Sequence, residues 1–152
     1  MERNILFLCT GNSARSQMGE ALLKKHAKDY FNVYSAGIEP AEQIFPQVIE
    51  AMKEIGIDIS DRKPKGVEHF LGKKNFEKVI IVCSDAEKKC PRIFGFSQRV
   101  FWPFEDPSSA AGSEETLLEV CRKVRGEIDR KICEWLDDQG IAARPVSPPG
   151  EN

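Results

Sequence analysis

The loop from Cys9 to Ser16 combines a thiol with groups that bind oxyanions. Its sequence is Cys-Thr-Gly-Asn-Ser-Ala-Arg-Ser, and five residues separate Cys9 from Arg15. The loop leaves the apolar run Asn4 to Leu8 and opens a helical pattern, so its backbone N–H groups can converge on an anion at a helix N-terminus. Arg15 can hold a tetrahedral oxyanion through two parallel hydrogen bonds. The predicted oxyanion-binding residues are Thr10, Gly11, Asn12, Ser13, Ala14, Arg15 and Ser16.

Cys9 is the predicted nucleophile. A thiol at a helix N-terminus beside an arginine loses its proton more easily than a free thiol, so we expect the pKa of Cys9 to be lowered. The hydroxyls of Ser13 and Ser16 can donate to the thiolate and lower this pKa further. Gly11 is expected to take a backbone conformation that a Cβ would resist. The competing interpretation, a small apolar residue ending a buried strand, fits the strand–loop–helix context less well.

Asp106 is the candidate proton donor. A departing oxygen needs a proton from a nearby acid, and Asp106 stands in a loop that follows the predicted strand Arg99 to Trp102. Its alternative interpretation is a turn residue before Pro107, which is a common arrangement.

Cys83 and Cys90 form a candidate resolving pair. Thiolates exchange disulfides stepwise, so Cys83 would attack the sulfur of Cys9 and Cys90 would then attack Cys83. A disulfide needs Cα atoms within about 7 Å, so residues 84–89 must rearrange for the pair to close. The alternatives are that Cys83 is inert core and Cys90 an incidental surface thiol.

No metal site is predicted. The chain has five cysteines and no Cys-x-x-Cys pair, and an odd number of cysteines argues against a disulfide framework. The last predicted helix starts at Ser113, whose hydroxyl can cap it, and Leu117 and Cys121 lie on its apolar stripe. Cys121 is assigned to the core, whereas Cys133 falls off that stripe and is taken as a bystander. His26 and His69 have no motif around them and are assigned no role.

Strands and helices alternate along the chain, which predicts a single α/β domain with a four-stranded parallel sheet flanked by helices. In such sheets ligands bind beyond the carboxyl ends of the strands, where Cys9 and Cys83 both stand. The domain is expected to span residues 1–140, followed by a mobile tail over 141–152. The predicted strands are Asn4 to Leu8, Phe31 to Ser35, Val79 to Val82 and Arg99 to Trp102, and the predicted helices run from Ser13 to Lys28, from Pro46 to Gly56 and from Ser113 to Gly140.

Composition excludes several classes of partner. The chain has 152 residues and a formal net charge of −2, which gives no general attraction to nucleic acid or an acidic membrane. The N-terminal apolar run is too short for a signal peptide, and no run approaches the ~20 residues of a membrane span. We expect a soluble, cytoplasmic monomer.

Together these motifs resemble the thioredoxin-coupled arsenate reductases, which share the fold of the low-molecular-weight tyrosine phosphatases. The resemblance covers nearly the whole chain, from Ile5 to about Leu136. The pieces that carry it are Cys9 to Met18, Tyr34 to Ile38, Ala51 to Ser60, the Cys83/Cys90-Pro91 pair and the Trp102 to Pro107 segment.

The resemblance implies a three-thiol reduction of arsenate. Cys9 attacks arsenate held by the loop and Arg15, while Asp106 assists the departing oxygen. Cys83 then attacks Cys9 and arsenite leaves. Cys90 attacks Cys83, and thioredoxin reduces the resulting Cys83–Cys90 disulfide, with a glutaredoxin as the alternative electron donor. Phosphate and sulfate would compete with arsenate for the loop.

The chain departs from the family where some members bind potassium, near Asn12 and Ser35. Lysines stand in the corresponding stretch, 61–65, so we predict no bound cofactor and no potassium requirement. Two other functions stay open. One is a tyrosine phosphatase that uses Cys9, Arg15 and Asp106, and the other is a non-catalytic redox or oxyanion sensor.

Overall fold

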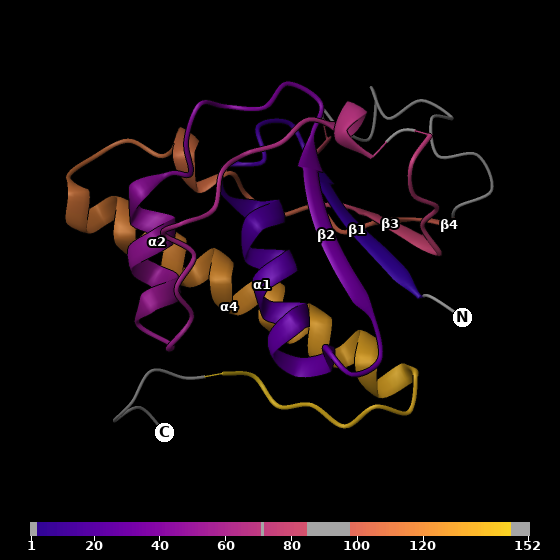
Figure 1. Cartoon of the computed structure of the whole chain (residues 1–152). Coiled ribbons are helices and arrows are strands. Elements are labelled where there is room, and N and C mark those ends of the chain that lie inside the picture. Colours follow the sequence, from indigo (N-terminus) through magenta and orange to yellow (C-terminus); the bar gives the residue numbers. More distant parts are fainter. Residues whose placement is uncertain (1–2, 71, 85–97, 147–152) are drawn as a thin grey trace.

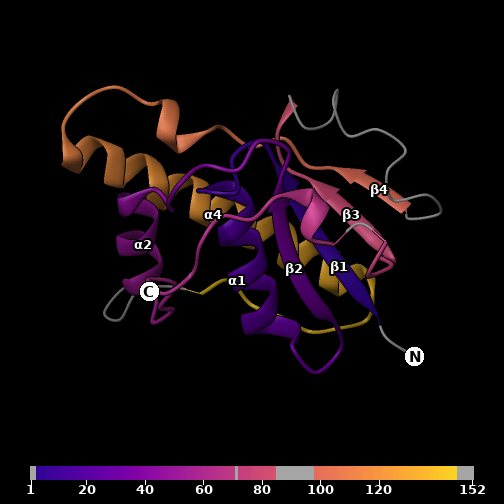
Figure 2. The same cartoon turned by 45° about the horizontal axis from the view of Figure 1, so that its top comes forward.

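The computed structural model describes residues 3–70, 72–84 and 98–146. Within these residues, four parallel strands form one sheet in the order β2–β1–β3–β4, side by side in Figure 2. This confirms the predicted single α/β domain with a four-stranded parallel sheet. The strands are β1 (Asn4–Cys9), β2 (Asn32–Gly37), β3 (Lys78–Ile81) and β4 (Gln98–Phe101).

Strand β1 lies inside the sheet and carries the nucleophile at its end. All six of its residues are buried, as expected for an apolar run covered on both faces of a parallel sheet. The register pairs Cys9 with Gly37 of β2 and Leu8 with Ile81 of β3. Cys9 therefore ends β1 at the carboxyl edge of the sheet, where ligands bind in such folds.

In the described part of the chain the longer helices are α1 (Arg15–Ala27), α2 (Pro46–Lys53) and α4 (Glu114–Asp138), shown in Figure 1. Helix α1 packs on β1 and β2 and against α4, and α2 packs against α4. A Cβ on Gly19 would lie 2.5 Å from the Phe7 ring, so glycine at this position lets α1 approach β1 closely.

Helix α4 begins as predicted but buries a broader face. The Ser113 hydroxyl accepts a hydrogen bond from the backbone N–H of Thr116, which is the expected N-cap. Leu117 was expected on the apolar stripe but is only half-buried, and Leu118 is buried instead. The buried face is broader than one stripe because α4 contacts both α1 and α2.

The first residues beyond α4 are not separate from the domain. Ile141 is only 8% exposed, and Ala143 and Val146 pack against the core. The expectation of a mobile tail therefore does not describe residues 141–146, and the boundary at residue 140 stays a prediction. No helix in the described part of the chain is long and apolar enough to cross a membrane.

Candidate active site

The Cys9 sulfur lies under a tight turn of its own loop. It accepts a hydrogen bond from the backbone N–H of Asn12 at 3.1 Å, and its contact with the Ser16 hydroxyl is 2.8 Å. Cys9 is 2% exposed and Ser16 is fully buried. The predicted Ser16 contact is present, and both donors favour a thiolate over a thiol.

Asn12 makes this turn, and the prediction for Gly11 was wrong. Asn12 is the residue with a left-handed backbone, at φ +52°, whereas Gly11 does not have a positive φ. Asparagine tolerates this conformation when its side chain bonds locally. Here the Asn12 amide donates to Ser16 Oγ at 2.8 Å and accepts from the Gln17 amide and the Lys65 backbone N–H.

The glycine that the loop requires lies on the neighbouring strand. A Cβ on Gly37 would lie 2.6 Å from the Thr10 carbonyl oxygen and 2.9 Å from the Asn12 nitrogen. Gly37 pairs with Cys9 in the sheet. The end of β2 therefore has to be glycine so that the loop can fold over Cys9.

A cavity of about 200 Å³ opens above Cys9. The N-cap of α1, Ala14, offers no side-chain cap, and the first turn carries no acidic residue, so the positive end of the helix is available to an anion. Asn12 and Ser16 do not line the cavity and instead support the loop from below. The lining residues are Cys9, Thr10, Gly11, Ser13, Ala14, Arg15, Asp106 and Ser108.

Arg15 reaches across the cavity to the segment that carries Asp106. Its Nη1 donates to the Phe104 carbonyl at 3.0 Å, and its Nη2 lies 3.5 Å from Asp106 Oδ2. Among the described residues, no partner is found for its buried Nε. A buried donor without a partner is costly, and it is suited to an anion that enters the cavity.

Asp106 lies at the rim of the cavity and also caps a short helix. Its carboxylate accepts from the Ser108 backbone N–H and hydroxyl at 3.0 and 2.7 Å, and from the Ser109 hydroxyl at 3.1 Å. Burial works to raise the pKa of Asp106, but these bonds and the charge of Arg15 hold it below the ordinary value. Asp106 therefore does act as a turn residue and also lies at the cavity, while its role as proton donor stays a prediction.

Burial reverses the expected pKa shift of Cys9. The thiol is enclosed, and this burial raises the pKa above its ordinary value. The Ser16 hydroxyl, the Asn12 N–H and the Arg15 charge all act to lower the pKa but do not outweigh the burial. The expectation of a lowered pKa was wrong because the sequence does not reveal how completely the sulfur is enclosed.

Cys83 lies next to the same loop. Its sulfur is 3.3 Å from Thr10 Oγ1, and the residue is 3% exposed. The pairing of β1 with β3 brings it there, since Val82 donates to the Leu8 carbonyl one residue earlier. Cys90 lies outside the described residues. Cys121 is fully buried, as predicted for the core.

A buried carboxylate that sequence reasoning missed lies behind the loop. Glu20 is 4% exposed and accepts from the Ser35 hydroxyl at 2.6 Å. It pairs with Arg62 and with Lys24, and the Lys65 ammonium lies 3.8 Å away. Burial acts to raise the pKa of Glu20, but the hydrogen bonds from Lys24 and Ser35 and the charges of Lys24 and Lys65 hold this pKa below the ordinary value. A glutamate within a helical pattern gave no sequence signal because such residues are usually solvated.

Together, a thiol at the end of β1, an uncapped helix N-terminus and an arginine form one cavity whose chemistry suits a small oxyanion. Residues 4–142 match the model of the low molecular weight phosphotyrosine protein phosphatases. The chain belongs to this family.

Among its relatives is the arsenate reductase of Bacillus licheniformis, 44% identical over 131 residues, which cover 86% of this chain and 93% of the relative. A solved arsenate reductase in the phosphate-binding state is 29% identical, with a TM-score of 0.74 over 90% of this chain and 98% of its own. The thioredoxin-dependent arsenate reductase of Corynebacterium glutamicum is also 29% identical, with a TM-score of 0.66 over 90% of this chain and 60% of its own.

Proposed function

We propose that this protein reduces arsenate to arsenite with Cys9 as the nucleophile. The observation that carries the proposal is the cavity over Cys9, which joins an uncapped helix N-terminus to Arg15 and has a second thiol, Cys83, beside its wall. Relatives of similar length that are 44% identical are named arsenate reductases, which supports the same activity.

Arsenate would bind with its oxygens toward the loop amides and Arg15. Nε and Nη2 of Arg15 would donate hydrogen bonds to the arsenate oxygens. Because Nη2 then has a second anionic partner, its contact with Asp106 loosens. A bound dianion disfavours a second negative charge nearby, so it raises the pKa of Asp106. Asp106 can then hold the proton that a departing oxygen needs. Without the anion, Arg15 and the serine hydrogen bonds favour the deprotonated carboxylate.

The first step forms a sulfur–arsenic bond. The Cys9 sulfur attacks arsenic, and one oxygen leaves as water with the thiol proton and a proton from Asp106 or solvent. Arsenic is still pentavalent in this adduct. The Ser16 hydroxyl and the Asn12 N–H stay bonded to the sulfur and orient it.

The second step reduces arsenic. Cys83 attacks the Cys9 sulfur, the sulfur–arsenic bond breaks, and its electron pair stays with arsenic, which leaves as arsenite. The two thiols become a Cys9–Cys83 disulfide. Cys90 then attacks Cys83, which restores the Cys9 thiol and leaves a Cys83–Cys90 disulfide for an external dithiol.

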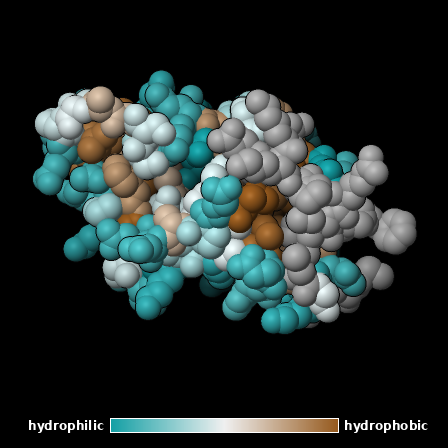
Figure 3. Space-filling model, turned by 90° about the horizontal axis from the view of Figure 1, so that it is seen from above, coloured by the Kyte–Doolittle hydropathy of each residue, from teal (hydrophilic) through white to brown (hydrophobic). Residues whose placement is uncertain are grey.

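We assign the external dithiol to thioredoxin. The relative from Corynebacterium glutamicum is thioredoxin-dependent. The face at the carboxyl ends of the strands, seen from above in Figure 3, carries hydrophobic surface among hydrophilic groups. Such a surface is compatible with a transient protein partner. The expectations of a monomer and of a cytoplasmic location stay predictions.

A coupled assay tests the proposal. The protein is mixed with arsenate, thioredoxin, thioredoxin reductase and NADPH, and NADPH oxidation is followed. We expect arsenate-dependent oxidation that Cys9→Ser, Cys83→Ser and Cys90→Ser each abolish. Oxidant-driven formation of the Cys83–Cys90 disulfide without arsenate turnover would instead indicate a redox sensor.

A phosphotyrosine phosphatase is the second candidate, because its chemistry needs the same cavity and Arg15 but no second thiol. Cys83→Ser separates the two functions. Under our proposal the variant loses arsenate turnover, while any weak hydrolysis of p-nitrophenyl phosphate persists. A rate of aryl phosphate hydrolysis that far exceeds arsenate turnover in the unmodified protein would favour the phosphatase.

We also propose that the protein needs no potassium. The Arg62 guanidinium and the Lys65 ammonium already neutralise Glu20 beside Ser35 and the Asn12 loop. A melting temperature that rises with potassium chloride but not with sodium chloride at equal ionic strength would contradict this.

A further inference from the structure

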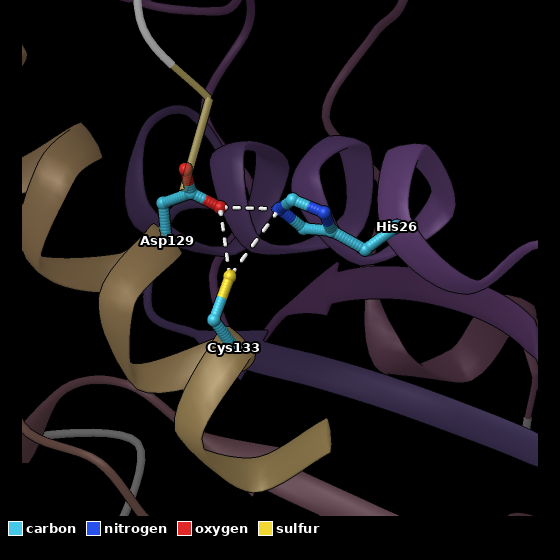
Figure 4. A group of neighbouring side chains, drawn as sticks. All are labelled: His26, Asp129 and Cys133. Atoms are coloured by element: carbon cyan, nitrogen blue, oxygen red, sulfur yellow. Dashed lines mark hydrogen bonds and ion pairs between the residues drawn. The ribbon is translucent and has the colours of Figure 1, made fainter. Parts of the chain in front are cut away.

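Three side chains that the proposed reaction does not use converge at the other end of α1. His26 lies in the last turn of α1, and Asp129 and Cys133 lie four residues apart on α4 (Figure 4). His26 Nε2 is 2.6 Å from Asp129 Oδ1 and 3.7 Å from the Cys133 sulfur, which is 4.0 Å from the same Oδ1. Cys133 was expected to be a bystander, but it is buried within this cluster.

The geometry is that of chelation and not of a proton relay. In a catalytic relay the two ring nitrogens of histidine face different partners, the acid on one side and the nucleophile on the other. Here one nitrogen, Nε2, faces both Asp129 and Cys133 (Figure 4). The nitrogen, oxygen and sulfur atoms therefore point toward one shared position, all within 4.8 Å of one another.

We propose that His26, Asp129 and Cys133 bind a divalent cation of the zinc type. Imidazole, carboxylate and thiolate are the three ligand classes of zinc in proteins. Zinc lies about 2.0–2.3 Å from such atoms, so in a tetrahedral site these are roughly 3.3–3.7 Å apart. Two of the observed separations, 3.7 and 4.0 Å, are close to this range, and the 2.6 Å hydrogen bond has to open to admit the ion.

Charge and burial suit a dication. A thiolate and a carboxylate balance two positive charges, which leaves a neutral buried site, and burial of an unbalanced charge would be costly. The side chains of His26 and Asp129 are 8% and 3% exposed. The site also lies at the C-terminal end of α1, where the helix dipole favours a cation. The fourth position would hold water.

The backbone of Val146 orients the Asp129 carboxylate of the site. Asp129 Oδ2 accepts a hydrogen bond from the Val146 N–H at 2.6 Å, which leaves Oδ1 directed at His26 and Cys133. Partners of this kind hold metal ligands in place. A cation would therefore link α1, α4 and the segment 141–146, and its effect should be on stability, since His26 is separated from Arg15 by nearly the whole length of α1.

Cobalt(II) tests the site because cobalt bound by a thiolate absorbs in the near ultraviolet. The full chain carrying Cys9→Ser, Cys83→Ser and Cys90→Ser excludes the thiols of the proposed reaction. We expect one equivalent of cobalt to produce the band in this variant and zinc to displace it. Adding Cys133→Ser should remove the band, and adding His26→Gln should weaken binding at least tenfold.

Cys121→Ser is the matched control on the same helix and should leave the band unchanged. Zinc should also raise the melting temperature of the triple variant but not of the variant with Cys133→Ser. If no band forms, or if the band survives Cys133→Ser and His26→Gln alike, the three residues are only an interhelical contact. Circular dichroism establishes that each variant is folded, and His26→Gln decides the outcome if Cys133→Ser does not fold. The test does not depend on arsenate reduction.

Discussion

The residues around Cys9 either hydrogen-bond to its sulfur or hold the loop that covers it. Ser16 does both, because its hydroxyl contacts the Cys9 sulfur and accepts from the Asn12 amide. Ser13, by contrast, lines the cavity, and no hydrogen bond to the sulfur is found for it among the described contacts. The two serines, both predicted as donors to the thiolate, are therefore not equivalent.

Ser16→Ala should make Cys9 less reactive. The Ser16 hydrogen bond acts to lower the pKa of a thiol that burial has raised, so its loss raises this pKa further. The pH profile of Cys9 alkylation by iodoacetamide should move to higher pH. At neutral pH the rate should fall on the order of tenfold, since a hydrogen bond to a charged group contributes roughly 1.5–3 kcal/mol. Peptide mass spectrometry measures alkylation at Cys9 itself.

Ser13→Ala is the control, and its profile should stay near that of the unmodified protein. Equal shifts for the two variants would mean that Ser16 has no special relation to the sulfur.

Glu20 should contribute stability that depends on pH. Its pKa is lowered in the folded protein, so its contribution is present above the ordinary carboxyl range and is lost as the pH falls through the folded value. Glu20→Gln should cost about 3 kcal/mol at neutral pH, because it removes the buried carboxylate that balances the half-buried Arg62 and Lys65. The gap in urea-unfolding free energy between the variant and the parent should narrow as the solution is acidified.

Lys24→Met provides the matched comparison. The Lys24 side chain is 41% exposed, so its ion pair with Glu20 is screened by water and should contribute under about 1 kcal/mol. A gap for Glu20→Gln that stays constant with pH would argue against a buried ion-pair role.

At the scale of elements, the approach of α1 to β1 positions the two sides of the cavity over Cys9. The helix carries Arg15 at its start and Gly19 one turn later, and Gly19 is where the helix backbone comes close to Phe7. A displacement of α1 would therefore move Arg15 relative to Cys9. Stability and activity are coupled at this contact.

Gly19→Ala should destabilise the protein although alanine is the better helix former. The added Cβ would lie 2.5 Å from the Phe7 ring, and overpacking of this kind costs about 1–3 kcal/mol. On α4, Gly126→Ala meets only the end of the Arg130 side chain at 3.4 Å and should gain up to about 1 kcal/mol from helix propensity. Thermal unfolding of both variants checks the opposite signs, and two stabilising substitutions would contradict the close packing at Gly19.

At the scale of the molecule, the segment 141–146 turns back from the end of α4 (Figure 1) and packs against the core. Ile141 is buried in the core, and the Val146 N–H donates to Asp129, which pairs with His26 of α1. The segment is thus bonded to Asp129, whose partner His26 lies 103 positions away in the sequence.

Removal of residues 141–152 should lower the unfolding free energy by about 2 kcal/mol or more, because a buried isoleucine and a carboxylate bond are lost together. Truncation after Val146 retains both contacts and should change stability much less. Urea unfolding of the two truncated chains measures the difference, and equal losses would mean that 141–146 contributes nothing of its own.

The sequence alone determined the features that depend on the pattern of neighbouring residues. The apolar runs specified the parallel strands, and the strand–loop–helix pattern specified that Cys9 and Arg15 would lie at one cavity. Both follow from neighbouring residues, whose spacing decides which face or end of an element they occupy.

Only the tertiary structure decided how distant segments meet. It enclosed Cys9 enough to raise its pKa, put the left-handed turn at Asn12, buried Glu20 among cations and joined His26 to α4. Such contacts depend on how closely whole elements pack and how much water they exclude, and no pattern within one segment reports either quantity.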